Sequence, residues 1–203
     1  MEYYNKFAND YYKTTGTLDA VPLCSCLVNA IKERAGGCQK SFNVLDLGCG
    51  SGRDSYYLAG LGFKVFSIDK SEKLLGLAKN AVNYDSDLFV KFLCADFLAL
   101  PFKSNFFDAV LAQASLLHLP KNKLRGAFME VKRSIKPGGF FYFSLKRGAG
   151  ESFDDKGRFF SYYTDEEVIT ALSDTGFSVI SRSDSKSLDN RDITWLGYLV
   201  SSI

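Results

Sequence analysis

The chain has 203 residues, of which 46% are hydrophobic and 24% charged, and its formal net charge is +2. This is the composition of an ordinary globular protein with one sizeable core, and the balanced charge disfavours a nucleic-acid or anionic-membrane partner without ruling out a small RNA substrate. No apolar run is long enough to cross a membrane, and the aromatic, charged N-terminus does not resemble a signal peptide, so we expect a cytoplasmic protein with no membrane partner.

The cysteines are odd in number and irregular in spacing: Cys24, Cys26, Cys38, Cys49 and Cys94. In a chain for which no secretory signal is expected, this pattern predicts reduced thiols. We expect no metal site, because a single residue separates Cys24 from Cys26 and His118 is the only histidine.

The elements predicted in the first half of the chain alternate between helix and strand. A helical repeat of apolar residues runs over residues 18–34, with Pro22 near its start. Buried strands are predicted over three apolar stretches: residues 41–47, 63–69 and 88–96. One helix begins near Arg53, and another is capped by Ser71. The second of these helices carries apolar residues on one face: Leu74, Ala78 and Val82.

The second half continues the alternation. A fourth strand over residues 106–114 precedes a helix that Pro137 and two glycines stop. Its apolar stripe contains Leu124, Ala127, Phe128, Val131 and Ile135. A fifth strand over residues 140–146 leads to a helix with a Thr164–Glu167 capping box and a terminal Gly176. Two strands, over residues 177–185 and 194–202, close the chain without a helix between them, so we expect them to pair antiparallel.

This order of elements predicts an α/β fold, in which a mainly parallel sheet carries helices on both faces. No repeat and no linker divides the chain. We therefore expect a single domain over residues 1–203, with an N-terminal helical cap over residues 1–36 and a ligand-binding core over residues 42–203.

A glycine-rich loop lies between the first strand and its helix, where open α/β sheets bind ligands. Gly48, Gly50 and Gly52 let backbone amides approach a ligand closely. The loop is not a P-loop, since Arg53 rather than a Lys-Ser/Thr pair follows it, and the dinucleotide fingerprint fails because its third glycine is missing. The carboxylate of Asp46, just ahead of the loop, would repel a phosphate and attract an ammonium group.

Two further acids end the next two strands. Asp69 closes the second strand, where a carboxylate can accept hydrogen bonds from both hydroxyls of a ribose. Asp96 closes the third strand beside Phe97, an arrangement that suits an adenine amino group with an aromatic neighbour. Each acid alone could be a turn or cap residue, but three acids around one glycine loop favour a nucleoside that carries an amino acid.

Several motifs, in this order and spacing, resemble those of the class I S-adenosylmethionine-dependent methyltransferases: VLDLGCGSG, VFSIDKS, CADFLALPF, FFDAVLAQASLLHL and KPGGFFYFSL. The resemblance covers about residues 42–146. It implies a Rossmann-like three-layer sandwich, whose seven-stranded, mainly parallel sheet has an antiparallel last strand. That architecture matches the order of elements predicted above.

By position, the resemblance implies that Gly48, Gly50 and Gly52 line the methionine part of the cofactor S-adenosylmethionine, whose product is S-adenosylhomocysteine. Asp46 would lie near the amino group of that methionine. The remaining implied cofactor-binding residues end the next three strands: Asp69 at the ribose with Lys70 beside it, Asp96 and Phe97 at the adenine, and Gln113 facing the reaction centre.

Two stretches, GSGRDSYYLAGLG and ASLLHLP, resemble more specifically a bacterial subgroup of small methyltransferases related to the tellurite-resistance and small-molecule enzymes. The N-terminal pattern ANDYYKTTGTLD also recurs in that subgroup, which implies that Tyr11 and Thr15 lie on a segment folded over the cofactor. Arg53 is a candidate for the methionine carboxylate and equally for a salt bridge at the surface or the helix start.

His118 is the candidate catalytic residue. Methyl transfer mainly requires alignment of the reactants and exclusion of water, because the cofactor supplies the reactivity. Thiolates and selenium or tellurium anions need no base, whereas an oxygen or nitrogen nucleophile can need one. His118 follows the fourth strand on the cofactor side, so it is either that base or a histidine whose hydrogen bonds shape the loop before Pro120.

The methyl acceptor is the least determined part of the prediction. The aromatic N-terminus is either a lid over the substrate or a helix packed on the sheet. Other candidate substrate contacts are Arg158, Tyr162, Tyr163, Arg191 and Trp195.

The sequence favours S-adenosylmethionine-dependent methyl transfer to a small molecule, by a monomer or weak homodimer. One alternative is a methyltransferase acting on RNA, of the tRNA wobble-uridine type, which would need a more basic surface. Another is a non-catalytic S-adenosylmethionine-binding protein. A nicotinamide oxidoreductase is disfavoured by the missing third glycine of the loop.

Overall fold

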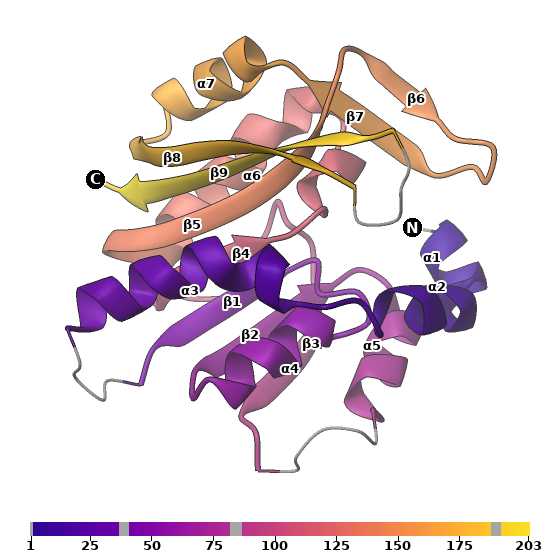
Figure 1. Cartoon of the computed structure of the whole chain (residues 1–203), viewed down its shortest axis with the longest axis horizontal. Helices are drawn as coiled ribbons and strands as arrows, with labels where there is room; N and C mark the ends of the chain where they lie inside the picture. The colour runs from indigo at the N-terminus through magenta and orange to yellow at the C-terminus, as the bar shows by residue number, and fades with distance from the viewer. Residues whose placement is uncertain (1, 37–40, 82–86, 188–191) are drawn as a thin grey trace.

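The computed structural model describes residues 2–36, 41–81, 87–187 and 192–203 (Figure 1). Its centre is a nine-stranded sheet. The strands are β1 (Asn43–Leu47), β2 (Lys64–Asp69), β3 (Val90–Cys94), β4 (Phe107–Ala112), β5 (Ile135–Arg147), β6 (Glu151–Phe153), β7 (Phe159–Tyr163), β8 (Phe177–Lys186) and β9 (Thr194–Ser202). The helices are α1 (Glu2–Lys6), α2 (Ala8–Thr15), α3 (Val21–Ala35), α4 (Arg53–Gly60), α5 (Glu72–Lys79), α6 (Lys121–Ser134), α7 (Asp165–Ser173) and the short 3₁₀ helix η1 (Leu116–His118).

The sheet is mainly parallel with antiparallel final strands, as predicted, but it has nine strands rather than the seven that the resemblance implied, because the β6–β7 hairpin joins it. Strands β3, β2, β1, β4 and β5 lie side by side in that order and run parallel. On the far edge of β5, β9 pairs antiparallel, and β8 pairs antiparallel with β9. The carboxyl ends of the parallel strands therefore meet at one edge of the sheet, which is where such folds bind ligands.

Two apolar clusters fill the space on the two faces of the sheet, because successive strand residues point to opposite sides. Val44 of β1 packs in one cluster with α3 and α4, whereas the next residue, Leu45, packs in the other with α6 and α7. Helix α3 contributes Leu27 and Ile31, both almost fully buried, as the helical spacing predicted. The α/β prediction with helices on both faces is confirmed.

The main addition to the predicted strands is the β6–β7 hairpin. Strand β7 pairs with Lys146 and Arg147 at the carboxyl end of β5. Because β9 already occupies one edge of β5 at Lys146, β7 must lie on the other edge, beyond the point where β4 ends. The two strands of the hairpin are three and five residues long, too short for a sustained alternating pattern, and they were not predicted. The hairpin and helices α1 and α2 lie at the same end of the sheet (Figure 1).

Smaller differences concern element boundaries. Helix α6 ends at Ser134, so Ile135, predicted as the last residue of the helical stripe, instead begins β5. Ser71 caps α5 as predicted, and Thr164 and Glu167 form the predicted capping box of α7. The predicted Val82, Cys38 and Arg191 lie outside the described residues. Among the described helices, none combines the length and apolar character needed to span a bilayer.

Candidate active site

The glycine loop is held in place by its own backbone. The amides of Gly48 and Cys49 both donate to the carbonyl of Ile68 in β2, at 2.8 and 2.9 Å. The φ angles of Gly48, Gly50 and Gly52 are +84°, +52° and +80°, in the region that favours glycine. A Cβ on Gly48 would lie 2.4 Å from that of Ser115. Gly48, Gly50 and Gly52 therefore form a loop of backbone without side chains, here called the bare-backbone cradle. Larger residues at these positions would fill the space beside the backbone.

Asp69 connects the loop to the next strand end. One of its carboxylate oxygens accepts from the Gly50 amide at 3.0 Å, and the other accepts from the Ser71 amide at 2.8 Å. Burial raises the pKa of this carboxyl, although the amide bonds from Ser71 and Gly50 act in the opposite direction. The carboxylate is thus fixed at the edge of the loop by two backbone amides, of Gly50 and Ser71, that belong to different elements.

Asp46, in β1 just before the loop, contacts α4. It accepts from the Ser55 hydroxyl at 2.6 Å, and Ser55 in turn accepts from Ser67 at 2.8 Å. Burial and the nearby carboxylate of Asp54 raise the pKa of Asp46. A cationic group near this carboxyl would offset both of those costs.

Arg53 is engaged by its neighbour. Its guanidinium forms a two-pronged ion pair with the Asp54 carboxylate, with both N–O distances at 2.7 Å. The same guanidinium lies 3.5 Å from the carbonyl of Thr15 at the end of α2. Two roles were predicted for Arg53, a contact to the methionine carboxylate and a salt bridge. The structure contains the salt bridge, at the start of α4.

The third strand end carries an exposed ion pair. The ammonium of Lys70 lies 2.6 Å from Asp96, whose other oxygen accepts from the Leu98 amide at 2.9 Å. Partial burial raises the pKa of Asp96, but these bonds outweigh it and lower the pKa overall. The ring of Phe97 lies against Gly48, so the predicted adenine and methionine ends of the site adjoin each other.

Gln113 contributes an unused acceptor. Its side-chain Oε1 is one of two buried side-chain oxygens that have no hydrogen-bond partner within the described part of the chain. A buried amide oxygen without a partner is costly unless a ligand supplies a donor. With the bare cradle and three acids, this oxygen fits a ligand that bears amino and hydroxyl donors, as S-adenosylmethionine does.

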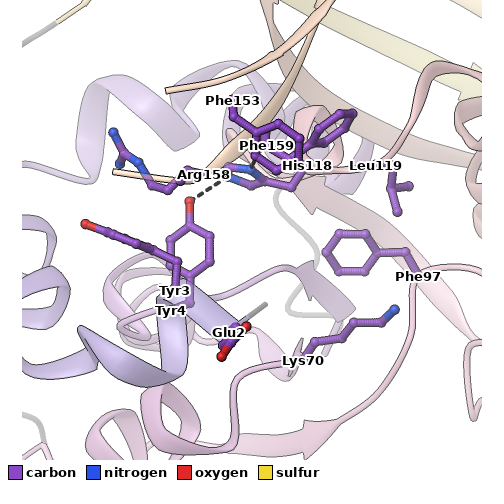
Figure 2. Close-up of a pocket in the computed structure, with 11 residues that line it drawn as sticks. Glu2, Tyr3, Tyr4, Lys70, Phe97, His118, Leu119, Phe153, Arg158 and Phe159 are labelled. Carbon is purple, nitrogen blue, oxygen red and sulfur yellow. Dashed lines mark hydrogen bonds between the residues drawn. The ribbon is translucent and has the colours of Figure 1, made fainter. Parts of the chain in front are cut away.

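His118 is half-buried, and both of its ring nitrogens are hydrogen-bonded. Nδ1 lies 2.8 Å from the carbonyl of Phe159, which can only accept, so Nδ1 carries the proton. Nε2 therefore accepts from the hydroxyl of Tyr4, also at 2.8 Å (Figure 2). Burial lowers the pKa of His118 to about 4, and the cations Lys146 and Arg158 lower it further against the bond to Phe159.

Helices α1 and α2 cover the carboxyl edge of the sheet. The ring of Tyr11 lies over Gly50, and the hydroxyl of Thr15 donates to Ser51 at 3.3 Å. Asn5 accepts from the Ser71 hydroxyl at 2.8 Å, which docks α1 on the start of α5. Tyr11 and Thr15 thus lie beside the glycine loop, and their predicted position over a bound cofactor stays a prediction.

The hairpin supplies the opposite wall. A cavity of about 320 Å³ lies between it, the N-terminal helix and the sheet edge (Figure 2). The residues that line this cavity are Glu2, Tyr3, Tyr4, Lys70, Phe97, His118, Leu119, Phe153, Gly157, Arg158 and Phe159. Arg158 is paired with Asp154 at 2.6 Å and stacks its guanidinium 5.5 Å from the ring centre of Tyr3.

The other predicted substrate contacts lie elsewhere or behind this wall. Tyr163 lines a separate groove between α6 and α7, and Trp195 pairs with Lys146 across β5 and β9. Lys146 was not singled out in the sequence, yet it is buried and its ammonium lies 3.4 Å from the ring centre of Phe160. Its place at the carboxyl end of β5 is the only sequence signal that could have identified it.

Within the described ranges, no three His, Cys, Asp or Glu side chains are grouped so as to hold a metal ion. The four cysteines described there, Cys24, Cys26, Cys49 and Cys94, are free thiols. Burial raises the pKa of Cys49, inside the glycine loop, well above its usual value, so this thiol is a poor nucleophile.

Residues 45–143 match the family model described as "Methyltransferase domain". The chain is 27% identical to sterol 24-C-methyltransferase of Schizosaccharomyces pombe over 174 residues, which is 78% of this chain and 46% of the relative. It is 39% identical to an uncharacterized methyltransferase of Synechocystis sp. over 98 residues, covering 48% and 44% of the two chains. The chain thus spans less than half the length of these curated relatives.

Two solved structures share the fold at low identity. One is the Burkholderia thailandensis 1,6-didemethyltoxoflavin-N1-methyltransferase with bound 1,6-didemethyltoxoflavin and S-adenosylhomocysteine, at a TM-score of 0.75 and 19% identity over 97% of this chain and 85% of that one. The other is the magnesium protoporphyrin IX methyltransferase of Synechocystis PCC 6803 with bound S-adenosylhomocysteine, at 0.75 and 18% over 100% and 97%. At these identities the similarity concerns the fold.

Proposed function

We propose that this chain, which belongs to the class I S-adenosylmethionine-dependent methyltransferases, transfers a methyl group from S-adenosylmethionine to a small-molecule acceptor. The observation that carries the proposal is the glycine loop. The Gly50 amide donates to the Asp69 carboxylate, and the bare-backbone cradle at Gly48 lies beside it. The relatives named above support a small acceptor, since by name one acts on a sterol and another on 1,6-didemethyltoxoflavin.

The residues that would hold the cofactor are those that the sequence predicted around this loop: Tyr11, Asp46, Gly48, Gly50, Gly52, Arg53, Asp69, Lys70, Asp96, Phe97 and Gln113. The carboxylates of Asp69 and Asp96 would accept from ribose hydroxyls and the adenine amine, and Gln113 Oε1 would accept from the methionine end. When bound, S-adenosylmethionine supplies an electrophilic methyl group. The protein residues then bind, orient and exclude water.

A small acceptor is favoured over a polymer because the site is enclosed from two sides. Helices α1 and α2 cover the glycine loop, and the β6–β7 hairpin faces them across the cavity. An RNA substrate would have to enter between these walls. We propose that His118, on the η1 helix between them, is the base that serves the acceptor.

Trp195, the only tryptophan, provides the test of cofactor binding. Its fluorescence would be titrated with S-adenosylmethionine, S-adenosylhomocysteine and NAD. We expect both methionine-derived ligands to bind and NAD not to bind. Saturable binding of NAD alone would refute the proposed function.

The role of Asp69 gives the matching prediction. Asp69→Ala should weaken S-adenosylhomocysteine binding by about 1–3 kcal/mol, because charge-assisted hydrogen bonds to the ligand are lost. Asp174→Ala, an exposed substitution at the end of α7, serves as the control and should bind normally. Thermal melting of both variants would separate lost binding from lost folding. Equal affinity in a folded Asp69→Ala protein would show that the ribose assignment is wrong.

A further inference from the structure

The arrangement around His118 leaves neither of its ring nitrogens open to the cavity. Nε2 accepts from the Tyr4 hydroxyl (Figure 2), and Nδ1 donates to the Phe159 carbonyl. A bound acceptor would therefore meet the Tyr4 hydroxyl before either ring nitrogen. We propose that Tyr4 is a catalytic residue: its oxygen takes the proton of the acceptor while its own proton passes to His118. This inference rests on the proposed methyl transfer and names the residue that meets the acceptor.

The tautomer of His118 fixes the direction of this relay. A carbonyl oxygen has no proton to give, so Nδ1 must be the donor toward Phe159 and Nε2 must hold a lone pair. The Tyr4 hydroxyl therefore donates to Nε2. The lone pairs of its oxygen remain available to accept a hydrogen bond from a second partner.

Tyr4 is held rigidly in this orientation. Its ring makes edge-to-face contacts with Tyr3, Tyr11 and His118, at centroid distances of 5.4, 5.1 and 5.2 Å. Burial raises the pKa of the Tyr4 hydroxyl, so a free tyrosinate is disfavoured and a proton can pass only as another one leaves. Both Tyr4 and His118 line the cavity, which places the pair where an acceptor would bind.

The proton transfer balances without any further reactant. The X–H bond of the acceptor breaks, its electron pair stays on X, and the proton bonds to Tyr4 Oη. The Tyr4 O–H bond breaks at the same time, and that proton bonds to the lone pair of His118 Nε2. The imidazole becomes an imidazolium that still donates Nδ1–H to Phe159. Because His118 is a weak base here, the transfer is favourable only as the X–H group becomes acidic during reaction.

This relay selects a class of acceptor. It serves an oxygen or nitrogen nucleophile that carries a proton, and it offers nothing to a thiolate or a metalloid anion. The aromatic walls of the cavity, including Tyr3, Phe153 and Phe159, suit a flat, conjugated frame for that group. The acceptor class is therefore a phenol-like or aromatic-amine-like small molecule.

The premise can be tested without knowing the acceptor, because the chain has one histidine. Nitrogen-15 NMR of the ring should display the Nδ1–H tautomer in the wild type. Tyr4→Phe keeps the ring and removes the hydroxyl, so it should change the Nε2 shift and raise the titration midpoint of His118. Tyr12→Phe, on the neighbouring helix and outside the cavity, should change neither. An Nε2–H tautomer, or an Nε2 shift unaffected by Tyr4→Phe, would overturn the proposal.

The catalytic claim is tested with labelled S-adenosylmethionine and a panel of phenols, aromatic amines and thiophenol, the last being ionised at pH 8. Tyr4→Phe should reduce transfer to the phenols and amines at least tenfold through kcat, with S-adenosylhomocysteine binding within about threefold of the wild type. Wild-type transfer to thiophenol alone, or an unchanged kcat in Tyr4→Phe, would overturn the relay. If the wild type binds neither methionine-derived ligand, the proposed function itself fails. If it binds them but methylates no panel member, the proposed phenol-like or aromatic-amine-like acceptor class is wrong.

Discussion

The two walls of this site are built in different ways. The proposed cofactor side, from the glycine loop to Asp96, consists of backbone groups and strand-end side chains that lie close in sequence, such as Gly50 and Asp69, nineteen residues apart. The proposed acceptor side joins segments that are far apart: Tyr4 and His118 are 114 residues apart, and His118 and Phe159 are 41 apart. A backbone cradle tolerates little change, whereas a wall of side chains can be altered residue by residue. This difference explains how one fold accommodates many acceptors.

The largest effect should follow from filling the cradle. Gly48→Ala would place a Cβ 2.4 Å from that of Ser115, at a φ of +84° that L-residues avoid. Ser115 cannot simply move, because its hydroxyl donates to the Leu47 carbonyl at 2.6 Å. Strain and overpacking together should destabilise the fold by about 3–4 kcal/mol and abolish S-adenosylhomocysteine binding.

Gly62→Ala separates these two contributions. Gly62 has a φ of +89°, but a Cβ there would meet nothing within 4 Å. Its substitution should cost about 1–2 kcal/mol, the backbone strain alone, and leave binding intact. Urea unfolding and ligand titration of both variants provide the comparison. If the two variants lose equal stability, the close approach of Ser115 does not shape the loop.

On the acceptor side, the largest effect should be a pH dependence of stability. Burial lowers the pKa of His118 to about 4 in the folded state, below its unfolded value of about 6.5. The stability that comes from keeping the imidazole neutral is fully present above pH 6.5 and is lost as the pH falls toward 4. His118→Gln has no such titration, so the wild type should lose about 2–3 kcal/mol more than this variant between pH 7.5 and 4.

Urea unfolding of the two proteins at both pH values measures this difference, and the contributions of all other titrating groups cancel in it. The sign is as informative as the size. A wild type that gains stability relative to His118→Gln on acidification would mean that the imidazole is charged in the folded state. Both ring nitrogens would then carry protons, so Nε2 would donate to the Tyr4 oxygen instead of accepting from its hydroxyl.

The contrast between the two walls also explains how far the sequence could predict this molecule. Apolar runs and helical periodicity predicted the alternation of strands and helices along the chain through β5, and the absence of a helix between the last two strands predicted their antiparallel pairing. The glycine loop and its acids were found because strand ends meet at one edge of a parallel sheet. The Tyr4–His118 bond and the β6–β7 hairpin depend on contacts across the whole chain. The aromatic N-terminus and the region around Arg158 were marked as candidate substrate contacts, but the hairpin strands contain few residues and Tyr4 is one of many tyrosines, so no local pattern identified the strands or the bond.

The smallest expected effect lies where the two walls meet. Asn5 of α1 accepts from Ser71, whose hydroxyl also caps α5 by accepting from the Leu74 amide at 3.2 Å. Asn5→Ala removes the hydrogen bond from Ser71 and a long one, at 3.4 Å, from the exposed Lys73 amide, and it leaves the cap in place, so global stability should fall by only about 0.5–1 kcal/mol. The same loss should let α1 open more often, because this helix has only five residues and none of them is buried.

Hydrogen exchange of the α1 amides should therefore become several-fold faster in Asn5→Ala, while the amides of β1 and β4 keep their protection. Asn9→Ala, an exposed substitution on α2, is the matched control and should leave both regions unchanged. If α1 exchanges at the wild-type rate, the docking of α1 does not depend on Ser71. The Tyr4–His118 hydrogen bond would then be the contact that holds α1 over the site, and Tyr4→Phe should accelerate the same amides.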